Sequence, residues 1–147
     1  MTGAAEHAQQ GPAGPTEKGT DNAPVRLPPF KVRIESADVA EFLRATTGHP
    51  KHHGVPLTFP VRWLALPEVR GLILRSIGNG FIPVHEGQNF AYERALQIGA
   101  DYTVDIEAFR TPAPPHLTLR MSVVTEEGEI CARLETVMRI VPALKPA

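Results

Sequence analysis

The sequence has 147 residues, with 15 basic and 16 acidic side chains and a formal net charge of −1. This length suits one domain whose core needs neither disulfides nor a metal to fold. The balance of charge gives no electrostatic reason to expect a nucleic acid or an anionic membrane as partner. No segment reads as a membrane span or a secretory signal, and the single cysteine, Cys131, fits a half-buried strand position. We therefore expect a cytoplasmic protein without a metal or other cofactor.

Residues 1–28 are rich in Gly, Pro, Ala and polar residues, and Val25 and Leu27 are their only large aliphatic side chains besides Met1. Such a composition cannot bury enough apolar surface to offset an ordering entropy of about 1–2 kcal/mol per residue. The sequence predicts a disordered tail over residues 1–28 and a single domain over residues 29–147.

The first ordered elements are a strand and a helix. Apolar and polar residues alternate over 30–34, which predicts a short strand. Ser36 can cap a helix with an apolar face. We expect that helix to end near Gly48, where a left-handed terminus costs little, because Pro50 cannot continue it.

Two helical pieces follow a loop. The pattern predicts a central helix over residues 58–66, with Phe59 and Trp63 on one face, and a second piece over residues 67–77 that begins with a proline. The Gly-Asn-Gly sequence at 78–80 predicts a turn.

The remaining sequence alternates as strands do, with a proline-rich break at 111–116 and a tight turn at 126–128. The predicted strands cover residues 84–93, 102–109, 117–125 and 129–141. One amphipathic helix can cover one face of such a sheet. The expected fold class is therefore α+β, with a curved antiparallel β-sheet wrapped around a central helix.

Three segments resemble the MaoC-like dehydratases, also described as the (3R)-hydroxyacyl-thioester dehydratase family. They are DVAEFLRATTG (38–48), GVPLTFPVRW (54–63) and VHEGQNFAYERALQIGADY (84–102), in which Ala100 interrupts the family's Gly-Asp pair. The resemblance covers about residues 30 to 141 and is strongest to the N-terminal-half type, which pairs with a second module. It implies a hot-dog fold.

The family's reaction, as the resemblance implies it, is the reversible addition of water to an enoyl thioester of coenzyme A or acyl carrier protein. Catalytic members activate the water with an Asp and a His about five residues apart in the loop after the first helix. Here residues 48–54 read GHPKHHG, with His49 in place of the aspartate. The chain thus resembles the degenerate subunit that shapes the acyl channel beside a catalytic partner.

His49, His52 and His53 are the candidate catalytic residues, at the entrance to the helix that follows Gly54. One of them can act as a base or hydrogen-bond donor, or contact the channel or a partner, or the three can form a solvated polar loop. A metal site is not favoured, because no Cys, Asp or Glu lies near them in the sequence.

The candidate substrate-binding residues are Gly54, Phe59, Trp63 and His85. Phe59 and Trp63 can form the floor of an acyl channel or simply fill the core. His85 can line a substrate groove or form a hydrogen bond with the backbone. Four arginines, namely Arg62, Arg70, Arg75 and Arg94, can bind coenzyme A phosphates or remain on a solvated surface.

The leading hypothesis is a hot-dog subunit of an enoyl-thioester hydratase or 3-hydroxyacyl-thioester dehydratase that is not catalytic by itself. A homodimer that only binds an acyl thioester or another apolar ligand is the alternative. A self-sufficient hydratase and a thioesterase remain open, although Glu68 follows a proline and no acid is well placed for hydrolysis. An exposed sheet edge favours a homodimer or a heterodimer with a second hot-dog subunit.

Overall fold

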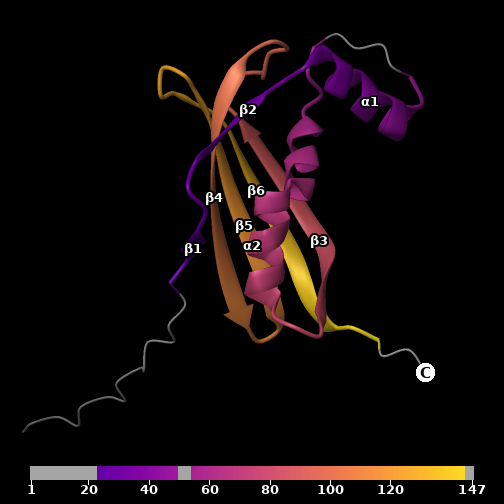
Figure 1. The fold of residues 1–147 in the computed structure, drawn as a ribbon, viewed down its shortest axis with the longest axis vertical. Coiled ribbons are helices and arrows are strands. Elements are labelled where there is room, and N and C mark those ends of the chain that lie inside the picture. The colour runs from indigo at the N-terminus through magenta and orange to yellow at the C-terminus, as the bar shows by residue number, and fades with distance from the viewer. Residues whose placement is uncertain (1–22, 50–53, 145–147) are drawn as a thin grey trace, which may run out of the picture.

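The computed structural model describes residues 23–49 and 54–144 (Figure 1). The chain order of the elements is β1 (Val25–Arg26), β2 (Phe30–Arg33), α1 (Ser36–Thr47), the 3-10 helix η1 (Phe59–Ala65), α2 (Pro67–Ile77), β3 (Phe81–Tyr92), β4 (Asp101–Pro112), β5 (Pro115–Thr125) and β6 (Ile130–Pro142).

The strands form one antiparallel sheet in the order β1-β4-β5-β6-β3, and β2 also pairs with β4. Helix α2 lies along one face of this sheet, and α1 lies beyond one end of it (Figure 1). Strand β3 pairs with β6 on one side, so its other side is a sheet edge. The architecture confirms the predicted antiparallel sheet covered by a helix. The helix that lies along the sheet is α2, the second predicted piece, and not the piece over residues 58–66 that was predicted to be central.

The core lies between α2 and the sheet. Alternate residues of β4, β5 and β6 are buried, as expected for strands with one face toward a helix. The helix contributes the four buried side chains Val69, Leu72, Ile73 and Ile77. Cys131 is fully buried in β6 rather than half-buried, because its side chain joins this core.

Two predicted boundaries are confirmed, namely the end of the first helix near Gly48 and the break between the two following helical pieces at Pro67. Helix α1 ends at Gly48, which adopts the left-handed conformation with φ 78°, although Glu35 rather than Ser36 is the residue before its first turn. The two central pieces separate at Leu66, whose extended backbone is the conformation favoured before Pro67. The first piece, η1, is a 3-10 helix rather than an α-helix.

Two predicted boundaries need correction. Residues Val25–Arg26, inside the predicted tail, pair with Ala108 and Glu107, because the outer edge of β4 offers them backbone hydrogen-bond partners. Residues 1–22 of that tail lie outside the described residues. The predicted proline break between β4 and β5 is also shorter than expected, since the strand pairing extends to Pro112 and Pro115 at the hairpin end.

None of the helices in the described part of the chain is both long and apolar enough to cross a membrane.

Candidate functional site

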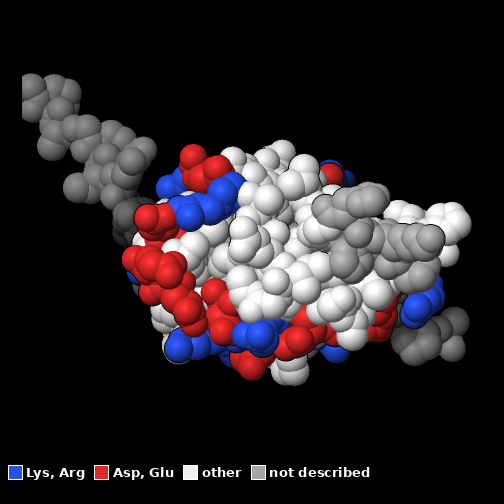
Figure 2. All heavy atoms as spheres, turned by 90° about the horizontal axis from the view of Figure 1, so that it is seen from above, with Lys and Arg blue, Asp and Glu red and all other residues white. Residues whose placement is uncertain are grey.

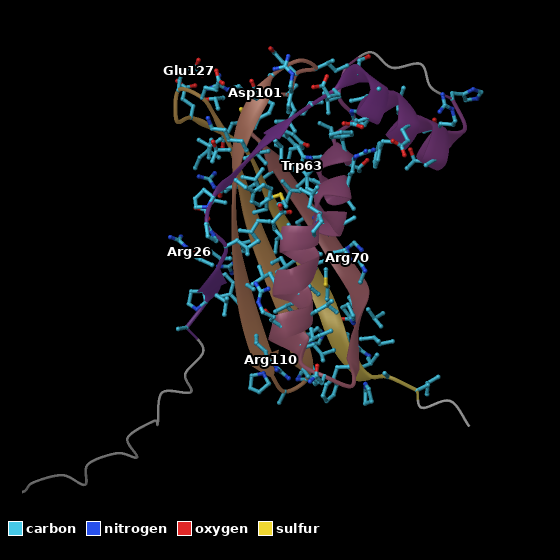
Figure 3. All side chains as sticks on the ribbon, in the orientation of Figure 1. Arg26, Trp63, Arg70, Asp101, Arg110 and Glu127 are labelled. Atoms are coloured by element: carbon cyan, nitrogen blue, oxygen red, sulfur yellow. The ribbon has the colours of Figure 1, made fainter. Side chains whose placement is uncertain are left out.

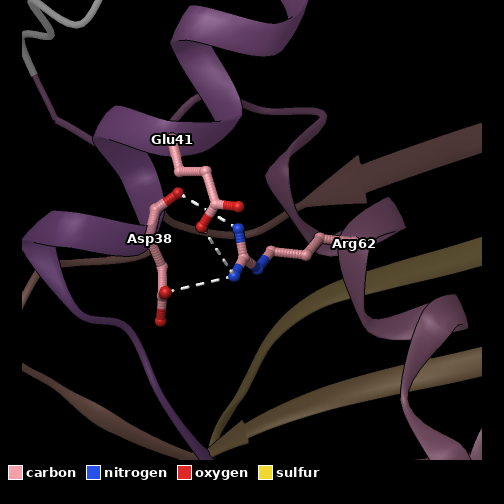
Figure 4. Close-up of polar contacts among 3 residues, drawn as sticks. All are labelled: Asp38, Glu41 and Arg62. Atoms are coloured by element: carbon pink, nitrogen blue, oxygen red, sulfur yellow. Dashed lines mark hydrogen bonds and ion pairs between the residues drawn. The ribbon is translucent and has the colours of Figure 1, made fainter.

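A polar network joins α1 to η1 at the entrance of the central helix (Figure 4). The Nη2 of Arg62 lies 3.1 Å from Oδ1 of Asp38 and 3.5 Å from Oε2 of Glu41, and its Nη1 donates to the Asp38 carbonyl oxygen at 3.3 Å. The guanidinium therefore bridges a helix and the segment that leads into α2.

Tyr92, at the end of β3, fixes the same entrance from the sheet side. Its hydroxyl donates a hydrogen bond to the Leu57 carbonyl oxygen at 2.6 Å. Burial raises the pKa of Tyr92 to about 12, so the phenol keeps its proton and remains a donor at physiological pH. The backbone just before η1 is thus tied to the end of a long strand.

The predicted histidine cluster is described only in part. His49 is exposed, and its backbone N–H donates to Oγ1 of Thr47 at 3.2 Å. His52 and His53 lie outside the described residues, so the catalytic role suggested for the cluster stays a prediction. Gly54, which follows them, has φ of 114°, a conformation that favours glycine over any other residue.

Phe59 and Trp63 are brought together in the core. They are 2% and 5% exposed, and their rings meet edge to face with centroids 6.2 Å apart. Phe42 of α1 completes the stack against Phe59 at 5.5 Å. Trp63 lies where η1 meets the sheet (Figure 3). In the described chain these aromatics attach η1 to α1, and their role as a channel floor stays a prediction.

His85 lies on the helix-facing side of the edge strand. It pairs with Met138, a core residue, and cross-strand partners project from the same face. The ring Nε2 lies 3.1 Å from the Gly87 carbonyl oxygen, and the side chain is exposed. A bulge between His85 and Gly87 places Glu86 as an extra residue in β3.

Glu86 is held on the opposite side of the sheet by two basic side chains. Its carboxylate lies 2.6 Å from Nε2 of His116 and 2.6 Å from Nη2 of Arg139. The other ring nitrogen of His116, Nδ1, lies 3.0 Å from the Pro114 carbonyl oxygen. The Pro114 carbonyl and the Glu86 carboxylate raise the pKa of His116, because both hydrogen bonds favour the charged imidazolium.

A second polar pair faces the helix beside His85. The Oγ1 of Thr136 donates to Oε1 of Gln88 at 2.7 Å, and the buried Nε2 of Gln88 has no partner among the described residues. Sequence reasoning missed this pair. The available signal was a glutamine and a threonine at positions of β3 and β6 that face the core.

The four arginines do not gather into one patch. Arg62 is in the α1–η1 network, and Arg94 forms an ion pair with Glu129. Arg70 and Arg75 are exposed on α2. On the face seen from above, acidic and basic side chains lie side by side around an uncharged central area (Figure 2). Within residues 23–49 and 54–144, no three His, Cys, Asp or Glu side chains come together as metal ligands.

Solved structures similar to this chain show that it has the hot-dog fold, as the sequence predicted. The HadBC complex of Mycobacterium tuberculosis, a (3R)-hydroxyacyl-ACP dehydratase, aligns with a TM-score of 0.63 at 18% identity, over 81% of this chain and 98% of that one. The (R)-hydratase of A. caviae aligns with a TM-score of 0.53 at 19% identity, over 82% and 98%.

A Thermus thermophilus hypothetical protein, a thioesterase superfamily member, aligns with a TM-score of 0.60 at 16% identity, over 81% of this chain and 82% of that one. No protein-family model and no curated protein matches the sequence. At these identities the similarity establishes the fold.

Proposed function

We propose that this chain is a hot-dog subunit of an acyl-thioester hydratase or dehydratase, and that a second hot-dog subunit supplies the catalytic residues. The supporting observation is the combination of a hydratase-like fold with a loop that reads Gly48-His49 where the family motif has Gly-Asp. The structures with this fold include a dehydratase and a hydratase whose chains align over 98% of their length.

The contribution of this chain to such a reaction is positional. The Arg62 network and the Tyr92 hydroxyl hold the helix entrance, which can form one wall of an acyl-thioester site. Hydration needs a base that takes a proton from water while oxygen bonds to C3 and a proton reaches C2. In our proposal the partner's carboxylate and histidine perform these transfers, in the cytoplasm, on a coenzyme A or carrier-protein thioester.

The edge of β3 is the proposed contact with the partner. This strand has 12 residues and carries the exposed apolar side chains Phe81, Ile82 and Val84. A long apolar strand edge favours pairing with another strand. A homodimer built on the same edge, which binds an acyl thioester without turning it over, is the alternative assembly.

The hydratase proposal is tested by following the hydration of crotonyl-coenzyme A. We expect little activity from the purified chain and a large gain when a hot-dog subunit with an intact Asp–His loop is added. Robust activity of the chain alone, abolished by His52→Ala or His53→Ala, would contradict the proposal and indicate a self-sufficient enzyme.

Thioester hydrolysis is the second candidate, because Glu68 lies exposed in the first turn of α2. A carboxylate there can activate water, but it is also explained by its favourable interaction with the helix N-terminus. Free thiol release from acyl-coenzyme A, lost in Glu68→Gln and retained in Glu126→Gln, would support hydrolysis. The absence of thiol release would exclude it for the acyl groups assayed.

A further inference from the structure

A hollow of about 260 Å³ lies where the last turn of α2 faces β1, β4 and β5. Figure 3 shows Arg110 beside the end of α2, well away from Trp63 in η1. The residues that line the hollow include Val25, Arg75, Ser76, Ala108, Arg110 and Leu117. The hollow is therefore separate from the helix entrance that Arg62 and Tyr92 hold.

The floor of the hollow is apolar. Ala108 of β4 and Leu117 of β5 are buried members of the core. Val25 pairs with Ala108 and therefore projects from the same face of the sheet. The volume is slightly below the roughly 300–1,000 Å³ that is typical of pockets for drug-sized molecules, which favours a smaller ligand with an apolar part.

The rim of the hollow carries two basic side chains, Arg75 of α2 and Arg110 of β4, and both are exposed. Nη1 of Arg110 donates to the Ser76 carbonyl oxygen at 3.1 Å, which caps the end of α2. A guanidinium has five N–H donors, so this bond leaves most of those of Arg110 available.

Gly71, one helical turn before Arg75, leaves room for its guanidinium. A Cβ at Gly71 would lie only 3.0 Å from Nη1 of Arg75. Glycine inside a helix is unfavourable relative to alanine, so a local reason for it is informative. The present position of the Arg75 guanidinium thus depends on the absence of a side chain at residue 71.

The two arginines of the hollow have no carboxylate partner. No ion pair among residues 23–49 and 54–144 includes Arg75 or Arg110. Two larger hollows also contain arginines, but carboxylates already contact them, namely Glu107 with Arg26, Glu135 with Arg120 and Glu129 with Arg94. The hollow at the end of α2 therefore offers positive charge that is not neutralised by an ion pair within the described chain.

We propose that this hollow binds a short aliphatic carboxylate. The carboxylate accepts hydrogen bonds from Arg75 and Arg110, because the planar guanidinium matches its two oxygens. The aliphatic chain lies against the apolar floor, where its burial adds to the affinity. This site goes beyond the proposed function and does not depend on it, since it lies at the other end of α2 from the helix entrance.

Nuclear magnetic resonance titrations of the full chain test the site with three probes. Hexanoate has both parts of the proposed ligand, 1-hexanol has the chain without the charge, and inorganic phosphate has charge without the chain. We expect hexanoate to shift the backbone amide signals of Ser76, Arg110 and Leu117 saturably. We also expect it to bind at least about tenfold more tightly than either other probe.

Arg75→Gln should weaken hexanoate binding about tenfold, because a charge-assisted hydrogen bond is lost. Arg70→Gln is the matched control, since Arg70 is an exposed arginine of α2 that does not line the hollow, and it should leave the affinity unchanged. Both variants change exposed side chains and should fold as the unmodified chain does.

Four results would overturn the site and leave the proposed function standing. They are the absence of saturable hexanoate binding, equal affinity for 1-hexanol or phosphate, equal weakening by Arg70→Gln and Arg75→Gln, and hexanoate shifts at Leu57 and Tyr92 instead of at the end of α2. The last result would place the acid at the helix entrance.

Discussion

His116 bonds to two acceptors, the Pro114 carbonyl oxygen and the Glu86 carboxylate, and both ring nitrogens can donate only when the ring is charged. Arg139 is the other charged group that faces this carboxylate. The folded chain therefore holds the His116 pKa above the ordinary value of 6.5. Because the His116 pKa is raised, its bonds stabilise the folded chain fully below pH 6.5. This stabilisation is lost as the pH rises through the His116 pKa of the folded chain.

We predict that the midpoint of thermal unfolding falls as the pH is raised from about 6 to 8, and that His116→Gln weakens this dependence. Measured over the same range, His49→Gln should retain the slope of the unmodified chain, because the side chains bonded to Glu86 are His116 and Arg139, and His49 is not among them. If His116→Gln and the unmodified chain had the same slope, the Glu86–His116 bond would not contribute to stability.

Tyr92→Phe isolates the single hydroxyl that reaches Leu57, since the aromatic ring is retained. We expect the free energy of unfolding to fall by about 1 kcal/mol, the net contribution of a typical hydrogen bond. Urea denaturation measures this change. A variant as stable as the unmodified chain would show that the contact does not hold the helix entrance.

At the scale of elements, patterns within a segment predicted the fold well. The alternation in β4, β5 and β6 is visible because one face of each strand is buried. The division at Pro67 was also predictable, because proline restricts the preceding residue. Strand β1 was not, since a two-residue strand depends on pairing with a distant partner rather than on its own pattern.

The candidate site was less predictable than the fold. Glu86 and His116 are 30 positions apart and meet because β3 and β5 lie on either side of β6. Gln88 and Thr136 are 48 apart, and their contact depends on the exact register of β3 against β6. A bulge sets that register, and no local pattern in the sequence predicts the bulge.

The loop into η1 provides a test of backbone conformation. Gly54 has φ of 114°, where an added Cβ would meet no atom within 4 Å but the backbone itself would be strained. We predict that Gly54→Ala lowers the free energy of unfolding by about 1–3 kcal/mol. Gly87→Ala is the matched control, because Gly87 lacks a positive φ and its Cβ would lie 3.9 Å from Val137.

Urea denaturation of both variants measures these costs. Equal stability of Gly54→Ala and Gly87→Ala would mean that the loop adopts another conformation at residue 54.

At the scale of the molecule, assembly through β3 has a direct consequence. Val84 is 43% exposed at this edge, and Val25 is 51% exposed in β1, the strand at the other end of the sheet order. We predict that Val84→Lys shifts an assembly toward monomers, since a lysine on an edge strand opposes strand pairing, whereas Val25→Lys leaves the assembly intact.

Light scattering coupled to size-exclusion chromatography measures the mass of both variants. Dissociation by Val25→Lys with retention of the assembly in Val84→Lys would place the interface at the opposite edge.

In our proposal, this chain completes a hydratase without being its catalyst. The most direct measurement is the rate of crotonyl-coenzyme A hydration as increasing amounts of the chain are added to a fixed amount of a hot-dog subunit that carries the Asp–His loop. We predict a negligible rate for the chain alone and a rate that rises until the two subunits are equimolar and then levels off. A rate that depends on this chain alone, or a rate that the addition of this chain leaves unchanged, would contradict the proposed function.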